Sequence, residues 1–98
     1  MVYTIEELRH IIAPVASRHG VESVHLFGSY STGKATDQSD VDLLISKGKI
    51  HTLFELSSFR LALEDALQLP VDMVTTTSQD REFLQSIKDD EVLLYRTA

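Results

Sequence analysis

Residues 28–44 read GSYSTGKATDQSDVDLL and carry the most specific structural signals of the chain. It opens with Gly28-Ser29 and reaches Asp40-Val41-Asp42 after an interval of ten residues. Residues 22–27 alternate in hydropathy up to Gly28, and residues 40–46 are apolar and β-branched after an acidic start. The stretch therefore predicts a strand, a tight turn into a short helix within residues 29–36, and a second strand.

The flanking sequence predicts two longer helices. Thr4-x-x-Glu7 and Thr52-x-x-Glu55 are capping-box patterns, and each precedes apolar residues at helical spacing. They indicate helices over about residues 5–18 and 53–67. Gly20 is suited to end the first helix, which contains Pro14. In the second, the residues expected in the core are Leu53, Leu56, Phe59 and Leu63, and the alternative is that an exposed remainder forms an interface.

Two strands and one further helix complete the prediction. Residues 71–75 and 92–95 are short apolar runs typical of strands. Between them Ser78 can cap a helix that carries Phe83, Leu84 and Ile87. This order of elements predicts an α+β fold over residues 1–98, with a small mixed sheet and helices packed mainly on one face. A chain of this length predicts one domain, so a large acceptor must be held by a partner.

The composition excludes several classes of function. The chain has 98 residues and a formal net charge of -6, which disfavours binding to a nucleic-acid backbone. It contains no cysteine, so disulfides and thiolate chemistry are excluded. The amino terminus carries Glu6 and Glu7 without an apolar signal core, and no apolar run approaches the length of a membrane span. We therefore expect a cytoplasmic protein.

Asp40 and Asp42 form the first candidate site. Residues i and i+2 of a strand point to the same side, so both carboxylates share one face while Val41 turns to the other. Their Cα atoms would be about 7 Å apart. Two carboxylates this close repel each other, and Mg²⁺, which prefers oxygen ligands and is often completed by phosphates, would relieve the repulsion. The simpler interpretation of such a pair alone is a polar strand start with exposed acids.

Gly28 and Ser29 form the second candidate site. A glycine between a strand and a helix lets the backbone approach a ligand closely, and the following N–H groups attract an anion. The Ser29 hydroxyl can donate to a phosphate oxygen or cap the helix, and the two roles are compatible. The neighbouring Tyr30 is explained either by packing or by stacking on a base. Together with the aspartates, the turn indicates a nucleoside triphosphate chelated to Mg²⁺.

Asp72 is a third candidate ligand. It is an acid inside the apolar run of residues 71–75, a position that is costly unless the carboxylate is paired or binds a metal. If this run lies beside residues 40–46, Asp72 joins the other two aspartates. The alternative is an edge-strand acid that pairs with a lysine or arginine. The four histidines have no ligand spacing and are not candidates.

These residues resemble the minimal nucleotidyltransferases, or MNT domains, of the DNA polymerase beta-like nucleotidyltransferase superfamily. The resemblance covers nearly the whole chain and rests on Gly28-Ser29, on Asp40-Val41-Asp42 and on Val71-Asp72-Met73-Val74. It implies that Gly28 and Ser29 bind the triphosphate and that Asp40, Asp42 and Asp72 hold two Mg²⁺ ions. It further implies transfer of a nucleoside monophosphate, commonly AMP from ATP, to a hydroxyl with release of pyrophosphate.

The resemblance also implies a partner and contains one departure. Many MNT domains are antitoxins paired with HEPN-domain toxins, and some add AMP to a tyrosine of the toxin. The same analogy implies association with such a partner or with a second copy. The family turn commonly reads Gly-Ser, then an aromatic residue or Arg, then x-Arg-Gly, whereas here Thr32 stands at the position of the second arginine and Lys34 follows two residues later. Two further functions therefore stay open, a non-catalytic antitoxin that acts by contact and a nucleotide sensor.

Overall fold

The computed structural model describes residues 2–76, 82, 85 and 90–97. All bounds predicted for helices and strands within these residues agree with the structure to one residue, and the short helix lies inside its predicted range. The elements are α1 (Ile5–His19), β1 (Ser23–Phe27), α2 (Ser29–Thr32), β2 (Val41–Ser46), α3 (Leu53–Leu67), β3 (Val71–Thr75) and β4 (Val92–Arg96). The helix predicted from Ser78, with Phe83, Leu84 and Ile87, lies outside the described residues.

α1 begins and ends with the predicted signals. The Glu7 N–H donates to Thr4 Oγ1 at 3.1 Å, and the Thr4 N–H donates to Glu7 Oε1 at 2.8 Å, which completes a capping box. The helix ends at Gly20, whose φ of 75° is left-handed and favours glycine. Pro14 lies within the helix. The sequence signals therefore set both ends of this helix.

α3 begins at a cap in which the Glu55 side chain bonds to the His51 N–H, and a hydrogen bond connects the helix to β3. The Glu55 N–H donates to Thr52 Oγ1 at 3.1 Å, whereas the Glu55 carboxylate accepts from the His51 N–H at 3.2 Å. After the helix ends, Glu64 Oε2 accepts the Val71 N–H at 2.9 Å. This bond fixes where β3 begins relative to the last turns of α3.

The sheet is mixed and has the order β3-β2-β1-β4. β1 is antiparallel to both of its neighbours, β2 and β4, whereas β3 runs parallel to β2. The parallel pair places Val41 opposite Val71 and Asp42 opposite Asp72. This pairing confirms that residues 71–75 lie beside β2, and it makes β3 an edge strand within the described sheet.

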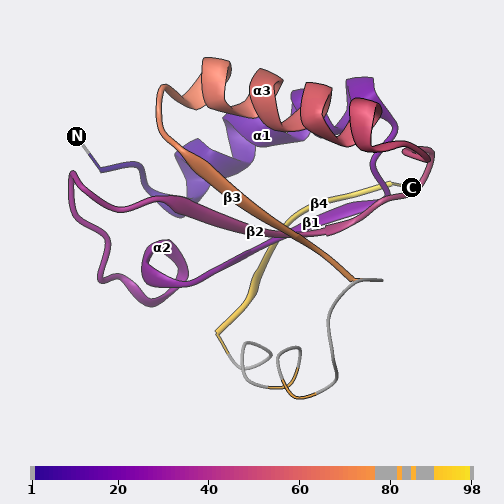
Figure 1. Cartoon of the computed structure of the whole chain (residues 1–98). Helices are drawn as coiled ribbons and strands as arrows, with labels where there is room; N and C mark the ends of the chain where they lie inside the picture. Colours follow the sequence, from indigo (N-terminus) through magenta and orange to yellow (C-terminus); the bar gives the residue numbers. More distant parts are fainter. Residues whose placement is uncertain (1, 77–81, 83–84, 86–89, 98) are drawn as a thin grey trace.

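Helices α1 and α3 pack side by side on one face of the sheet, as predicted (Figure 1). The core lies between them and the strands. Its fully buried members include Leu8, Ile12, Val24, Leu26, Leu43, Ile45, Phe59 and Leu63. In the part of the chain that the structure describes, no helix is long and apolar enough to cross a bilayer.

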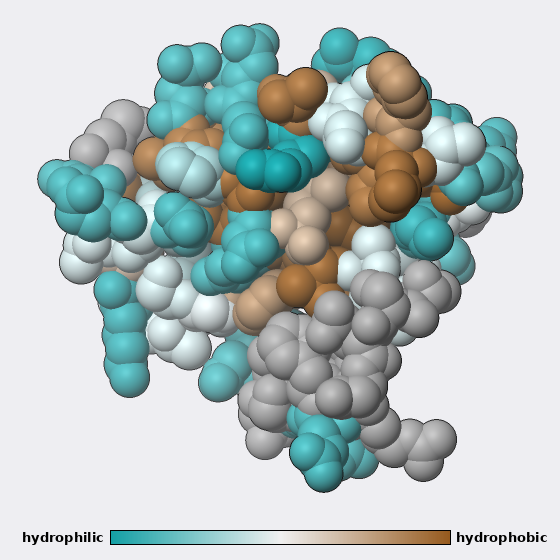
Figure 2. All heavy atoms as spheres, viewed as in Figure 1, coloured by the Kyte–Doolittle hydropathy of each residue, from teal (hydrophilic) through white to brown (hydrophobic). Residues whose placement is uncertain are grey.

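The outer side of α3 is unusually apolar. Leu53, Phe54 and Leu61 are 82%, 86% and 64% exposed, and hydrophobic side chains are visible on the surface over this helix (Figure 2). The expectation that Leu53 belongs to the core is therefore wrong. Leu53 precedes Phe59 by six residues, which places it about 120° away around the helix axis. Leu56, Phe59 and Leu63 do pack in or against the core.

Candidate active site

Gly28 ends β1 in a conformation that requires glycine. Its φ of 75° and ψ of -152° lie in a region that residues with a Cβ atom rarely adopt. A Cβ atom at this position would overlap Oδ2 of Asp42 and would stand 3.1 Å from its Cγ. Glycine is thus needed here both for the turn itself and for close contact between the turn and Asp42.

The short helix α2 holds the turn through its own hydroxyl groups. Ser31 Oγ donates to the Gly28 carbonyl at 2.9 Å, and Thr32 Oγ1 lies 3.3 Å from the same oxygen. Ser29 is half-buried, and its hydroxyl has no hydrogen-bond partner among the described residues. The Ser29 hydroxyl is therefore available to a ligand at the end of β1.

Tyr30 is part of the core and not of an open site. Its side chain is 5% exposed and packs in the main hydrophobic cluster. Its hydroxyl is buried without a hydrogen-bond partner among the described residues. Packing, one of the two explanations for this residue, is confirmed by the burial.

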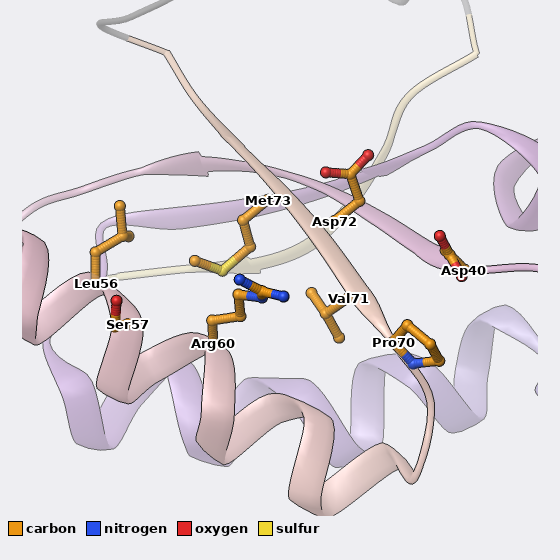
Figure 3. A pocket seen from close by; sticks show the side chains of 8 residues that line it. All are labelled: Asp40, Leu56, Ser57, Arg60, Pro70, Val71, Asp72 and Met73. Atoms are coloured by element: carbon orange, nitrogen blue, oxygen red, sulfur yellow. The ribbon is translucent and has the colours of Figure 1, made fainter.

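The three candidate aspartates lie on two adjacent strands. Asp42 faces Asp72 in the parallel register of β2 and β3, and Asp40 comes just before β2. Val41 and Leu43 belong to the core on the helical side, so Asp42 points to the opposite face of the sheet. Asp72 likewise points away from α3, whereas Val71 and Met73 point toward it (Figure 3). Asp42 is half-buried, and Asp40 and Asp72 are exposed.

Burial and the two neighbouring acids raise the pKa of Asp42 above its ordinary value of 3.8. Desolvation is the largest cause, followed by repulsion from the charges of Asp72 and Asp40 and by a hydrogen bond with Asp72. Repulsion from Asp72 and Asp40 acts on Asp42 because the three carboxylates are close to one another. The three predicted residues therefore form one electrostatic cluster.

This donor set fits a hard divalent cation. Carboxylate oxygens are the ligands that Mg²⁺ prefers, and a cation would remove the repulsion that raises the pKa of Asp42. Within residues 2–76, 82, 85 and 90–97, no three acidic or histidine side chains are already grouped closely enough to hold a metal ion. Binding of a cation by all three aspartates therefore requires their side chains to rearrange.

A cavity of about 380 Å³ lies beside the cluster, between α3 and β3 (Figure 3). Its lining residues are Asp40, Leu56, Ser57, Arg60, Pro70, Val71, Asp72 and Met73. The Arg60 guanidinium extends from α3 into the space next to Val71 and Met73 (Figure 3). Its Nε lies 3.7 Å from Glu64 Oε2, a loose ion pair that leaves its other donors available.

The sequence interpretation missed this cavity. Leu56 and Arg60 are four residues apart and so share one side of α3. That periodicity is the signal that the sequence offers. It does not show that this side of α3 faces β3 across an open space.

Comparison with known proteins identifies the family. Residues 9–98 match the family model described as polymerase beta, nucleotidyltransferase. Protein adenylyltransferase MntA of Thermococcus cleftensis is 35% identical over 79 residues, which cover 76% of this chain and 80% of that protein. A solved structure described as a minimal nucleotidyltransferase is 29% identical, with a TM-score of 0.79 over 92% of this chain and 95% of that one.

A more distant solved structure shares the fold alone. It is described as a tri-AMPylated Shewanella oneidensis HEPN toxin in complex with an MNT antitoxin. The matching chain is 20% identical, with a TM-score of 0.72 over 96% of this chain and 74% of that one. The family match, the mixed sheet and the contact between Gly28 and Asp42 agree. This chain belongs to the polymerase beta nucleotidyltransferase family, as a minimal nucleotidyltransferase.

Proposed function

We propose that this chain transfers AMP from Mg²⁺-bound ATP to a hydroxyl of a partner protein and thereby acts as an antitoxin. The partner is a HEPN-domain toxin, and the acceptor is a tyrosine of that toxin. The contact between the Gly28 turn and Asp42, with Asp72 in register on the next strand, carries the proposal. This contact supports a site in which a triphosphate held by the turn lies beside the carboxylates.

Each of these residues has a separate role in the proposed reaction. Gly28 gives the triphosphate access to the backbone, and the Ser29 hydroxyl donates to a phosphate oxygen. Asp40, Asp42 and Asp72 would hold two Mg²⁺ ions. When bound, these ions neutralise charge on the phosphates and stabilise both the attacking and the leaving oxygen. The acceptor oxygen forms a bond to the α-phosphorus, the bond from that phosphorus to the bridging oxygen breaks, and pyrophosphate leaves. The proton of the acceptor hydroxyl passes to the Asp72 carboxylate.

The relatives support the chemistry and the partner. The Thermococcus cleftensis relative is named as a protein adenylyltransferase, and the toxin in the Shewanella complex is AMPylated. Both descriptions concern other proteins, and here they motivate AMP as the transferred group and a HEPN toxin as the partner. A cytoplasmic location accords with this proposal, because the reaction consumes ATP.

The deciding experiment measures transfer and metal binding separately. ATP labelled at the α-phosphate is incubated with Mg²⁺, this chain and a purified HEPN-domain protein encoded beside it. We expect label on the HEPN protein with wild type and at least a hundredfold less with Asp42→Asn or Asp72→Asn. In the absence of nucleotide, Mg²⁺ should raise the melting temperature of the wild type and not that of Asp42→Asn.

Asp65→Asn is the matched control, because Asp65 is exposed on α3 away from the cluster. It should transfer label at the wild-type rate. If wild type labels no partner with any of the four nucleoside triphosphates, the enzymatic proposal is wrong.

A non-catalytic antitoxin is the second candidate function. Thr32 favours it, because its neutral side chain bonds the turn where the family commonly has a cation. Cells that produce the toxin would be complemented with the Asp40→Ala/Asp42→Ala double variant. Full rescue of growth would show that contact alone neutralises the toxin, whereas loss of rescue with retained binding would support catalysis.

A further inference from the structure

We infer that the acceptor enters as an extended polypeptide segment along the outer edge of β3, with one of its side chains in the cavity beside Arg60. This inference rests on the proposed function and adds to it where the acceptor binds and in which conformation. Its basis is the order of four features across the sheet: the Gly28 turn, Asp42, Asp72 and the outer edge of β3, which no other strand of the described residues covers.

The geometry of phosphoryl transfer fixes the side of attack. Attacking and leaving oxygens lie roughly in line with the phosphorus between them. The Gly28 turn follows Phe27, which pairs with Asp42 from the β1 side, and Asp72 pairs with Asp42 from the β3 side. A triphosphate anchored at the turn therefore directs its pyrophosphate toward β1. The attacking hydroxyl must then approach from β3.

The outer edge of β3 is suited to receive a strand. Within the described residues β3 pairs with β2 alone. The Val41 N–H donates to the Pro70 carbonyl, and the Thr76 N–H donates to the Ile45 carbonyl, so the even-numbered residues face β2. The alternation of a parallel ladder turns the N–H and carbonyl of Met73 to the outer edge. Glu64 already accepts the Val71 N–H, and Thr75 is also engaged in an interaction, which limits pairing to the backbone of Met73.

The alternation of side chains in an added strand determines which of its residues can enter the cavity on the helical side of β3. Successive side chains of an added strand point to opposite faces of the sheet. When the hydroxyl-bearing residue lies on the face of Asp72, its neighbour points toward α3 and enters the cavity of about 380 Å³. Leu56 and Met73 offer apolar contact there, and the free donors of Arg60 face oxygen atoms of the segment.

The surroundings of the cavity also suit a protein partner. Leu53 lies one helical turn before Ser57, a cavity-lining residue, and is 82% exposed on α3. A polypeptide that reaches the edge of β3 past Ser57 would cover this apolar side chain. The cavity is thus continuous with an exposed apolar surface that a protein acceptor can bury.

The test uses the absence of cysteine from the chain. Ser57→Cys introduces a single thiol at the cavity, and Ser17→Cys introduces one on α1 as the matched control, since both serines are exposed. Each variant is coupled to a bulky maleimide. Binding of the HEPN-domain protein is measured without nucleotide, and binding of Mg²⁺-ATP is measured separately. The adduct at position 57 should weaken partner binding at least tenfold and change ATP affinity less than twofold, and the control adduct should change neither.

Arg60 is tested as a positioning residue by kinetics. Arg60→Ala should raise the KM for the partner about tenfold with little change in kcat or in the KM for ATP, and Arg60→Lys should restore part of the loss. Unfolding in urea checks that both variants keep the fold.

Three results would overturn the inference. The first is weaker ATP binding with unchanged partner binding, which would make the cavity a nucleoside site. The second is an adduct at position 57 that changes neither affinity, and the third is the absence of any complex with the partner. The proposed function would fail in a distinguishable way: the wild-type protein would bind the partner at this edge but would transfer no label to it.

Discussion

Gly28 lies directly against the side chain of Asp42, so that the turn at the end of β1 and the carboxylate on β2 occupy neighbouring space with no room for a Cβ atom. The turn and the candidate metal-binding carboxylate are therefore one structural unit. A ligand held by the turn lies beside the aspartates without any movement of the strands.

Gly28→Ala should destabilise the protein and abolish transfer. The alanine would have to hold a backbone conformation that costs about 2 kcal/mol and would also collide with Asp42. Gly33→Ala is the matched control, because Gly33 has a φ of 79° but no atom within 4 Å of a built Cβ. It should cost about 1 kcal/mol and retain transfer. Urea unfolding and label transfer measure both effects, and equal loss of activity in the two variants would contradict the expectation.

The stability of the metal-free protein should depend on pH through Asp42. Because the pKa of Asp42 is raised in the fold, the folded state keeps a proton that the unfolded chain has already lost. The contribution of the Asp42 carboxyl group to the free energy of unfolding is complete below its ordinary pKa of 3.8. It is lost as the pH rises through the pKa of this group in the folded state. Asp42→Asn should therefore become more stable relative to wild type as the pH rises toward 7.

Urea unfolding in a chelator at several pH values measures this difference. Added Mg²⁺ at pH 7 should reverse it, because the cation stabilises the wild-type cluster and has fewer ligands in the variant. A stability difference that does not change between acidic and neutral pH would show that the pKa of Asp42 is not raised.

Thr32→Arg should strengthen nucleotide binding. Among the described residues, the Thr32 hydroxyl makes only long bonds to its own turn, 3.3 Å to the Gly28 carbonyl and 3.4 Å to the Ser29 carbonyl. An arginine there would add a charge-assisted bond to phosphate, for which we expect about a tenfold lower Kd for Mg²⁺-ATP. Lys34→Ala tests whether the nearby lysine already supplies such a charge. Calorimetric titration that finds no gain for Thr32→Arg would mean that this position does not face the phosphates.

Tyr30→Phe should stabilise the protein by about 1 kcal/mol, because it removes a buried hydroxyl that has no hydrogen-bond partner among the described residues. Tyr3→Phe is the opposite control. The Tyr3 hydroxyl donates to the Leu67 carbonyl at 2.7 Å, and its removal should cost about 1 kcal/mol. Thermal and urea unfolding give both values. Destabilisation by Tyr30→Phe would reveal a partner for that hydroxyl.

Local patterns predicted the elements because local interactions set their ends. The bounds of α3 and β3 agree residue for residue with the structure, since Thr52 caps the helix and Pro70 separates it from the strand. The local pattern did not predict whether the Leu53 side chain is buried or exposed. An apolar residue at the first position of a helix satisfies the spacing approximately, and only packing against the sheet decides which side is covered.

The amino-acid sequence alone indicated the components of the candidate site: the glycine turn, the paired acids of one strand face and the isolated acid in an apolar strand. These are short-range features, fixed by backbone sterics and by the alternation of side chains in a strand. The tertiary structure alone decided that β3 runs parallel to β2 with Asp72 opposite Asp42. It also alone placed Arg60 over an open cavity at the sheet edge. Both depend on the pairing of strands and the packing of α3 across the sheet, where contacts join residues distant in the chain and leave no local pattern.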